Sequence, residues 1–170
     1  MSDIIRATYD SIAVLTDMKG GSGDEAYFRQ CLAMQEEGAR DIYITQDKIT
    51  QDKNGAASGY VIFNRRPRYA LYQRLEIPEI QDLAVRPSCR RQGIGTALIL
   101  LCEQRARAES YDAIGISVGL HSGFGAAQRL YARLGYVPDG YGVTYDRATV
   151  AAGEIRPVDD DLCLMMVKDL

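Results

Sequence analysis

The amino-acid sequence predicts one α/β (α+β) domain, in which short strands alternate with amphipathic helices. Segments with the 3.6-residue repeat of a helix are separated by short apolar runs that are typical of strands. The chain has 170 residues, of which 46% are hydrophobic and 25% charged, so it is long enough to bury a sizeable core. No linker-like stretch divides it, and we expect residues 1–170 to form a single domain.

The first half of the chain predicts three strands and two helices. The strands are expected at residues 3–8, 42–45 and 59–64, and the helices at 9–19 and 24–38. Apolar spacing of i, i+3, i+4, i+7 supports the second helix, through Phe28, Cys31, Leu32 and Gln35. Gly38 supplies its stop, and Asn54-Gly55 predicts a hairpin turn between the second and third strands.

The second half predicts four more strands and two more helices. The strands are expected at 79–85, at 113–120 and in a closing pair at 142–146 and 162–167. One helix runs from about 95 to 109, with an apolar face of Ile94, Leu98, Leu101 and Cys102. The apolar face of the other helix is Ala127, Leu130, Tyr131 and Leu134. Gly135 ends that helix, and Pro138-Asp139-Gly140 predicts a turn before the closing strands.

The charge balance argues against a nucleic-acid binder, because such proteins usually carry a basic face. The formal net charge is −3. We interpret the arginines at 65–74 as the solvated end of a strand hairpin rather than a polyanion site. No apolar run approaches the roughly 18 residues of a membrane span, and the first residues lack the pattern of a signal peptide.

The cysteines and the single histidine limit the chemistry further. The chain has four cysteines, Cys31, Cys89, Cys102 and Cys163, and no two of them form a Cys-x-x-Cys motif. Without an export signal, this favours free thiols in a reducing cytoplasm. A histidine-rich metal site is excluded because His121 is the only histidine, and we expect a reaction that needs no metal.

The stretch VRPSCRRQGIGTAL, residues 85–98, runs from a predicted strand through two glycines into an apolar helix. A helix N-terminus carries roughly +0.5 of a charge and several unpaired N–H donors. Gly93 and Gly95 let an anion approach this backbone, and Arg90 and Arg91 add positive charge. The pattern indicates a phosphate site, although a tight turn between strand and helix also favours glycine.

Two other phosphate-binding motifs fit this chain less well. The Walker pattern, Gly-x4-Gly-Lys-Ser/Thr, does not occur. Gly21-Ser22-Gly23-Asp24-Glu25-Ala26 has the spacing of a dinucleotide fingerprint, but no strand runs directly into its glycines. A connection between two helices is the favoured interpretation; a dinucleotide-binding enzyme is the alternative and predicts nicotinamide or flavin binding.

Arg90-Arg91-Gln92-Gly93-Ile94-Gly95 satisfies the pattern Arg/Gln-x-x-Gly-x-Gly/Ala, and here the sequence resembles the GNAT superfamily of acetyl-CoA-dependent N-acetyltransferases. EIQDLAVRPSCRRQGIGTALI is similar to that family's fourth strand, phosphate loop and third helix. AAQRLYARLGYVPDG is similar to its later helix, whose pattern is Ala-x-x-Leu-Tyr-x-x-Leu-Gly-Phe/Tyr. The two motifs cover residues 79–140, whereas the first 75 residues match only in the order of elements. The resemblance implies a mixed, mostly antiparallel central sheet with splayed fourth and fifth strands, flanked by about four helices.

The same resemblance implies acetyl-CoA as co-substrate, held mainly by the backbone. The loop that would bind the pyrophosphate comprises Arg90, Arg91, Gln92, Gly93, Ile94, Gly95 and Thr96. Backbone groups of Leu83 and Val85 would hold the pantetheine arm and the thioester carbonyl. Donors aimed at a developing oxyanion contribute about 3 kcal/mol.

Two residues are candidates for proton transfer by resemblance. Tyr131 matches the tyrosine that commonly protonates the departing thiolate, although it also faces the core side of its helix. Glu79 begins the fourth strand, where some members place a general base; a surface role, with deprotonation through water, is the alternative. The asparagine that many relatives carry after the fifth strand is absent, and His121 and Ser122 stand near that place.

The family's acceptor lies between the loop joining the first two helices and the last strand pair, here about residues 19–24 and 146–161. The second segment carries Glu154, Asp159, Asp160 and Asp161, which favour a cationic amine unless they are simply solvated. Relatives are often dimers, which implies a homodimer.

We therefore predict transfer of an acetyl group to a primary amine of a small molecule or peptide, by direct attack in a ternary complex. No nucleic acid or membrane is expected as a partner. The alternative is a non-catalytic acyl-CoA-binding or regulatory module on the same fold. Such a module would keep Gly93 and Gly95 but would need neither Tyr131 nor a base.

Overall fold

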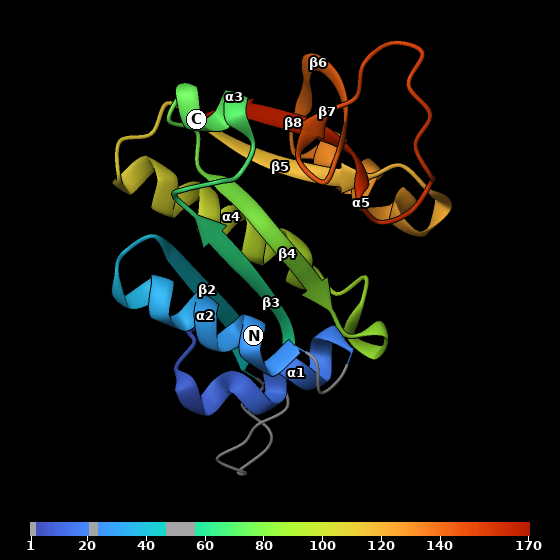
Figure 1. Ribbon diagram of the computed structural model, residues 1–170. Helices are drawn as coiled ribbons and strands as arrows, with labels where there is room; N and C mark the ends of the chain where they lie inside the picture. Colours follow the sequence, from blue (N-terminus) through green and yellow to red (C-terminus); the bar gives the residue numbers. More distant parts are fainter. Residues whose placement is uncertain (1–2, 21–23, 47–56) are drawn as a thin grey trace. The chain divides into compact units, whose positions relative to one another are not determined.

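The computed structural model describes residues 3–20, 24–46 and 57–170, which form two compact units (Figure 1). The first unit comprises Met1–Asn64 and Ile80–Cys102, and the second comprises Arg65–Glu79 and Glu103–Leu170. Gly21-Ser22-Gly23 of the dinucleotide-like motif and the Asn54-Gly55 turn lie outside the described residues.

The first unit is built on four strands that are neighbours in the order β1-β2-β3-β4. Their bounds are β1 (Asp3–Arg6), β2 (Arg40–Gln46), β3 (Ala57–Asn64) and β4 (Glu79–Val85), and β4 belongs to this unit from Ile80 onward. β2 pairs antiparallel with both β1 and β3. After the short 3-10 turn η1 (Tyr9–Ser11), α1 (Ile12–Lys19) packs on β3, and α2 (Glu25–Glu36) packs on β2.

The predicted apolar face of α2 is confirmed, because its four predicted residues are its buried ones. The polar member of this face, Gln35, satisfies its amide inside the core. Its Nε2 donates to the Ala7 carbonyl at 2.9 Å, and its Oε1 accepts from the Ile42 N–H at 2.9 Å. A buried amide with both ends bonded costs little, and here it ties the chain after β1 to β2.

The second unit has the strand order β5-β8-β6-β7, with antiparallel pairing throughout. These strands are β5 (Ala113–Gly119), β6 (Val137–Tyr145), β7 (Ala148–Thr149) and β8 (Leu162–Asp169). Its helical elements are α3 (Ala70–Arg74), η4 (Ser122–Phe124) and α5 (Gly125–Arg133). The loop after β4 contains η3 (Pro87–Cys89) and leads into α4 (Ile94–Ala108), whose first nine residues belong to the first unit.

The predicted α/β (α+β) class with mostly antiparallel strands is confirmed, and β4 has the predicted bounds. Two short elements, α3 and β7, were not predicted, because one helical turn and a two-residue strand are too short to show a period. The interpretation of residues 65–74 as a hairpin end is wrong, since β3 stops at Asn64 and α3 follows. The predicted splaying of the fourth and fifth strands involves β4 of the first unit and β5 of the second, and it stays a prediction.

The turn predicted at Pro138-Asp139-Gly140 is also wrong, because these residues lie inside β6. β6 keeps its pairing with β8 on either side of a register shift between Pro138 and Val143. Gly140 and Gly142 have φ values of +85° and +82° within this shift. The residues that suggested a turn therefore form a bulge, which lets a strand carry a proline and two glycines.

Gly59 in β3 lets the first turn of α4 approach the sheet. A Cβ at this position would stand 2.9 Å from Ile94 Cγ2 and 3.1 Å from the Ala84 carbonyl oxygen. The carbonyl belongs to the neighbouring strand and cannot rotate away. The absence of a side chain at residue 59 therefore sets how closely α4, and the loop before it, lie against β3.

We expect Gly59→Ala to destabilise the protein by about 1–3 kcal/mol, the usual range for overpacking. Urea unfolding would measure the change. Gly125→Ala is the matched control, since a Cβ there meets only the Arg129 Nη1 atom at 3.6 Å. Equal stability of the two variants would contradict the close approach of α4 to β3.

Candidate active site

Arg86 fixes the point where β4 ends and the glycine loop begins. Its backbone N–H donates to the Ser58 carbonyl at 2.9 Å, and its Nε donates to the Ala57 carbonyl at 2.7 Å. Its Nη2 also donates to Asp17 Oδ2 on α1 at 2.6 Å. One side chain thus holds the loop to β3 and to α1.

The loop reaches α4 through two residues with left-handed backbone conformations, Arg91 at φ +61° and Gly93 at φ +83°. Nothing lies within 4 Å of the position that a Cβ of Gly93 would take. Glycine is therefore favoured here by the backbone conformation, and the space above it is open. The Gly93 carbonyl accepts from the Ala97 N–H at 2.9 Å, which starts the helix.

The first turn of α4 presents the N–H groups of Ile94, Gly95 and Thr96 beyond Gly93. Helix geometry leaves such groups without partners inside the helix. Arg90 and Arg91, immediately before them, are exposed and cationic. The predicted loop residues thus form one segment that combines free donors, open space and positive charge, and this is the chemistry that a pyrophosphate requires.

Two side chains of the loop also support its own backbone. Arg90 Nε donates to the Val85 carbonyl at 3.2 Å, and Gln92 Nε2 donates to the Ser88 carbonyl at 3.3 Å. Arg90 therefore holds one of the two β4 residues whose backbone is expected to contact the pantetheine arm. The other, Leu83, follows an irregularity in the strand.

That irregularity is Asp82, whose φ of +50° is unusual for a residue inside a strand. Regular strand alternation would put Glu79, Gln81 and Leu83 on one face, and the left-handed Asp82 interrupts it. Before it, the Gln81 side chain accepts from Asn64 Nδ2 at 3.1 Å. The left-handed residue re-aims the backbone groups that follow, as a bulge does.

Glu79 is completely buried, and its carboxylate forms an ion pair with Arg147, whose Nη2 lies 3.1 Å from Oε1. Arg147 belongs to a two-residue turn between Tyr145 of β6 and Ala148 of β7. Both turn residues, Asp146 and Arg147, have positive φ, at +46° and +69°. Such a turn usually prefers Asn-Gly, so a strained backbone places the guanidinium against the buried acid.

Tyr131 lies on α5 and is 6% exposed. Burial raises the pKa of its phenol to about 12. Its ring centroid is 6.3 Å from that of Tyr136, in a tilted arrangement. The side chain is thus buried, as the core-facing interpretation requires, and it keeps its proton over the whole neutral range, as a general acid requires.

His121 has both ring nitrogens engaged. Its Nδ1 accepts from the Gly123 N–H at 3.1 Å, so the proton resides on Nε2, which lies 2.7 Å from Asp160 Oδ1. Both contacts lie within the second unit and hold the imidazole in the segment after β5.

The acidic segment after β7 is also largely engaged within its own unit. Asp159 accepts from the Tyr145 hydroxyl at 2.8 Å, and Glu154 pairs with Arg156. The Arg156 guanidinium in turn lies 5.2 Å from the centre of the Tyr145 ring. These contacts reduce the negative charge that the segment presents to a cationic acceptor.

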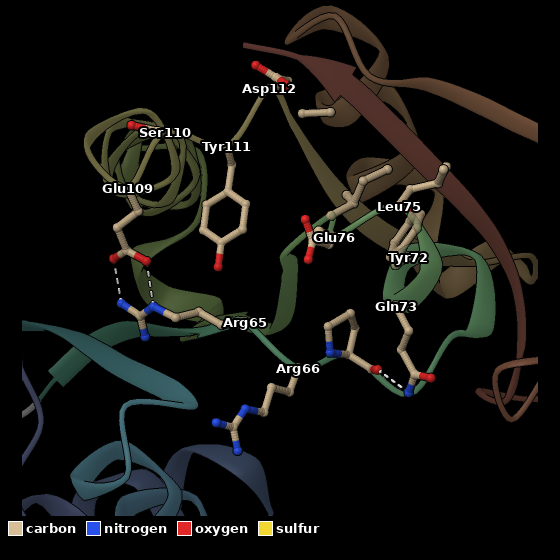
Figure 2. A pocket seen from close by; sticks show the side chains of 13 residues that line it. Arg65, Arg66, Tyr72, Gln73, Leu75, Glu76, Glu109, Ser110, Tyr111 and Asp112 are labelled. Carbon is tan, nitrogen blue, oxygen red and sulfur yellow. Dashed lines mark hydrogen bonds and ion pairs between the residues drawn. The ribbon is translucent and has the colours of Figure 1, made fainter.

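A cavity of about 780 Å³ lies in the second unit (Figure 2). It is lined by Arg65, Arg66, Pro67, Tyr72, Gln73, Leu75, Glu76, Ile77, Glu109, Ser110, Tyr111, Asp112 and Ala113. Arg65 and Glu109 form a two-pronged ion pair in its wall, with both N–O distances at 2.6 Å. None of the predicted site residues lines this cavity, so its volume gives no support to them.

Three further findings concern the described part of the chain only. It contains no group of three or more His, Cys, Asp or Glu side chains arranged to hold a metal ion. None of its helices combines the length and the apolar character that crossing a membrane requires. The four cysteines are free thiols.

The chain matches the Acetyltransferase (GNAT) family over residues 13–136, and it belongs to that family. No curated protein matches it in sequence. Among solved structures, the N-acetyltransferase of Staphylococcus aureus Mu50 has a TM-score of 0.69 at 16% identity, covering 99% of this chain and 98% of that one. The yncA protein of Salmonella typhimurium, solved with its cofactor acetyl-CoA, has a TM-score of 0.65 at 17% identity, with coverages of 99% and 94%.

A third similar structure is the ribosomal-protein-alanine N-acetyltransferase of Brucella melitensis. Its TM-score is 0.66 at 16% identity, and the match covers 99% of each chain. At such identities the likeness concerns the fold. Family membership rests on the sequence match, which includes the glycine loop and α5.

The sequence did not single out Arg147 or the anchoring role of Arg86. An arginine in a loop carries no signal of its partner, and both partners, Glu79 and Asp17, are distant along the chain. Pairing of this kind becomes visible only when the fold has brought the charges together.

Removing Arg147 leaves the buried Glu79 carboxylate without this ion pair. We expect Arg147→Met to cost about 3 kcal/mol of unfolding free energy. Adding Glu79→Gln should recover part of that loss, because a neutral amide is easier to bury than a carboxylate. Urea unfolding of the two single variants and the double variant gives the coupling energy, and strictly additive losses would contradict the pairing.

Proposed function

We propose that this chain transfers the acetyl group of acetyl-CoA to a primary amine, as a single-domain enzyme of the GNAT acetyltransferase family. The observation that carries the proposal is the loop before α4. There an open, left-handed Gly93 and two exposed arginines precede the first helical turn. A thioester is the acyl donor in this chemistry, so the acceptor nitrogen can attack directly in a ternary complex without a metal.

In this proposal the coenzyme pyrophosphate binds to the segment from Arg90 to Thr96. The donors are the backbone N–H groups, and Arg90 and Arg91 add positive charge that attracts the anion. Leu83 and Val85 bind the pantetheine arm and the thioester carbonyl through their backbone. The contact from Arg90 to the Val85 carbonyl supports this assignment, because it fixes the end of the strand beside the loop.

Tyr131 acts as the general acid that protonates the departing thiolate. Its burial supports the role, because the phenol carries a proton at every pH at which the reaction would run. Glu79 acts as the base, directly or through water. Its ion pair with the Arg147 guanidinium holds this carboxylate in position.

The acceptor is a small-molecule or peptide amine, and the setting is a reducing cytoplasm, which the four free thiols support. A homodimer is proposed by analogy with the family. A non-catalytic acyl-CoA-binding module would share the loop chemistry but would not depend on the phenol of Tyr131.

The loop is tested by comparing Gly93→Asp with Gly93→Asn. Both side chains tolerate a positive φ and have the same size, so their difference reports charge alone. We expect the aspartate to weaken coenzyme A binding by about 100-fold or more, and the asparagine to weaken it only several-fold. Calorimetric titration with acetyl-CoA measures both, and NADH serves as the control ligand. Undiminished affinity in Gly93→Asp would refute the assignment of the loop.

The acid is tested with Tyr131→Phe. We expect kcat to fall by about 100-fold while the acetyl-CoA affinity stays unchanged. Because burial raises the pKa of Tyr131 to about 12, the wild-type rate should show no alkaline fall from this group below pH about 11. A pH–rate profile with an amine acceptor measures both effects. Equal rates in Tyr131→Phe and wild type would leave this tyrosine a packing residue.

A further inference from the structure

In the first unit, the Lys19 ammonium lies against an acidic and an aromatic side chain. Lys19, at the end of α1, places its Nζ 2.9 Å from Asp82 Oδ2 on β4. The same carboxylate oxygen accepts from the Tyr27 hydroxyl of α2 at 2.5 Å. Burial, together with the neighbouring Asp82 carboxylate, raises the pKa of Tyr27, so this phenol remains a donor.

The aromatic face of Tyr27 completes the surroundings of this ammonium. The Lys19 Nζ lies 3.8 Å from the centre of the Tyr27 ring and 5.8 Å from the centre of the Phe28 ring. A carboxylate that accepts an N–H and a ring face that attracts a cation are the two groups by which proteins recognise alkylammonium ions. We call Asp82 and Tyr27 the ammonium site.

Stability alone gives a weak reason for this arrangement. The Lys19 and Asp82 side chains are 30% and 31% exposed, and an ion pair at this depth contributes little to stability. Asp82 meanwhile holds φ at +50°, a left-handed conformation that is unusual inside a strand. A strained residue that is not offset by its own ion pair points to a role in function.

The ammonium site adjoins the proposed acetyl site along the chain. Asp82 immediately precedes Leu83, whose backbone is proposed to hold the thioester carbonyl. We propose that Asp82 and Tyr27 bind the primary ammonium of the acceptor, and that Lys19 fills their site as an intramolecular competitor until an acceptor displaces it. The inference rests on the proposed function and specifies its substrate class as a primary alkylammonium on a slender chain.

The charge change of the reaction fits this arrangement. The acceptor ammonium gives up a proton to the base, its nitrogen attacks the carbonyl carbon, and the carbon–sulfur bond breaks as the amide bond forms. The thiolate takes a proton from the acid. The amide product is neutral and has lost its attraction to Asp82, so Lys19 returns and favours product release.

The test compares Lys19→Met, which removes the competitor, with Asp82→Asn, which removes the charge of the site and tolerates the same φ. The probe is n-butylammonium, titrated calorimetrically into each protein, and n-butylamine serves as acceptor for KM. We expect Lys19→Met to bind n-butylammonium about fivefold more tightly and to lower KM by the same factor. We expect Asp82→Asn to bind it about tenfold more weakly and to raise KM by the same factor. Acetyl-CoA affinity should stay unchanged in both variants.

Opposite changes in affinity distinguish the proposal from a purely structural role of the pair. A structural role would weaken n-butylammonium binding in both Lys19→Met and Asp82→Asn. The proposal would be overturned if the affinity for n-butylammonium, or KM, changed in the same direction in both variants. It would also be overturned if neither variant changed them. Tyr27→Phe, which keeps the ring and removes only the hydroxyl, should weaken binding less than Asp82→Asn does.

Two controls separate this site from general charge effects and from the proposed function. Arg29→Met and Glu25→Gln remove one charge of each sign from an exposed pair on α2, and both should bind n-butylammonium like wild type. Tetramethylammonium, which has no N–H to donate, should bind more weakly than n-butylammonium. If the probe binds as expected but no variant acetylates it, the proposed function fails while the ammonium site stands.

Discussion

The contacts of Arg86 are the constraint on which the rest of the first unit's site depends. A loop of exposed residues has no core of its own to hold it, so its shape must be imposed from its ends. Arg86 imposes one end by bonding the backbone of β3 and the Asp17 carboxylate of α1. Gly59 imposes the other by admitting the first turn of α4 to the sheet. Between these ends, the left-handed Gly93 has little freedom left.

The second unit contains a completely buried carboxylate, that of Glu79. A buried charge is tolerated only when it is paired. The partner comes from the tight turn between β6 and β7, at the expense of two unfavourable φ values. This pairing ties Glu79, the residue proposed as base, to the β6–β7 hairpin in this unit.

Two of the strained positions, Asp82 and Arg147, have the same kind of role. Each is a charged residue in a left-handed conformation, and each meets an opposite charge from an element distant in the sequence. Such residues persist when the surrounding structure holds them in place, and here they place charge beside the residues proposed to act on the substrates. The Acetyltransferase (GNAT) family match covers the loop and α5.

The sequence by itself determined the fold class, the family and the position of the glycine loop. Each of these rests on local information: helical and strand periods, glycines before a helix, and two motifs in register over residues 79–140. Tertiary structure alone decided which charges meet, namely Glu79 with Arg147, Asp82 with Lys19, and Arg86 with Asp17. It also turned the expected turn at Pro138 into a bulge of β6, because pairing with β8 outweighed the local preference of proline and glycine. Local residue preferences contribute from tenths of a kcal/mol to about one. Strand pairing and burial involve many residues at once, so they can override a local preference where distant segments meet.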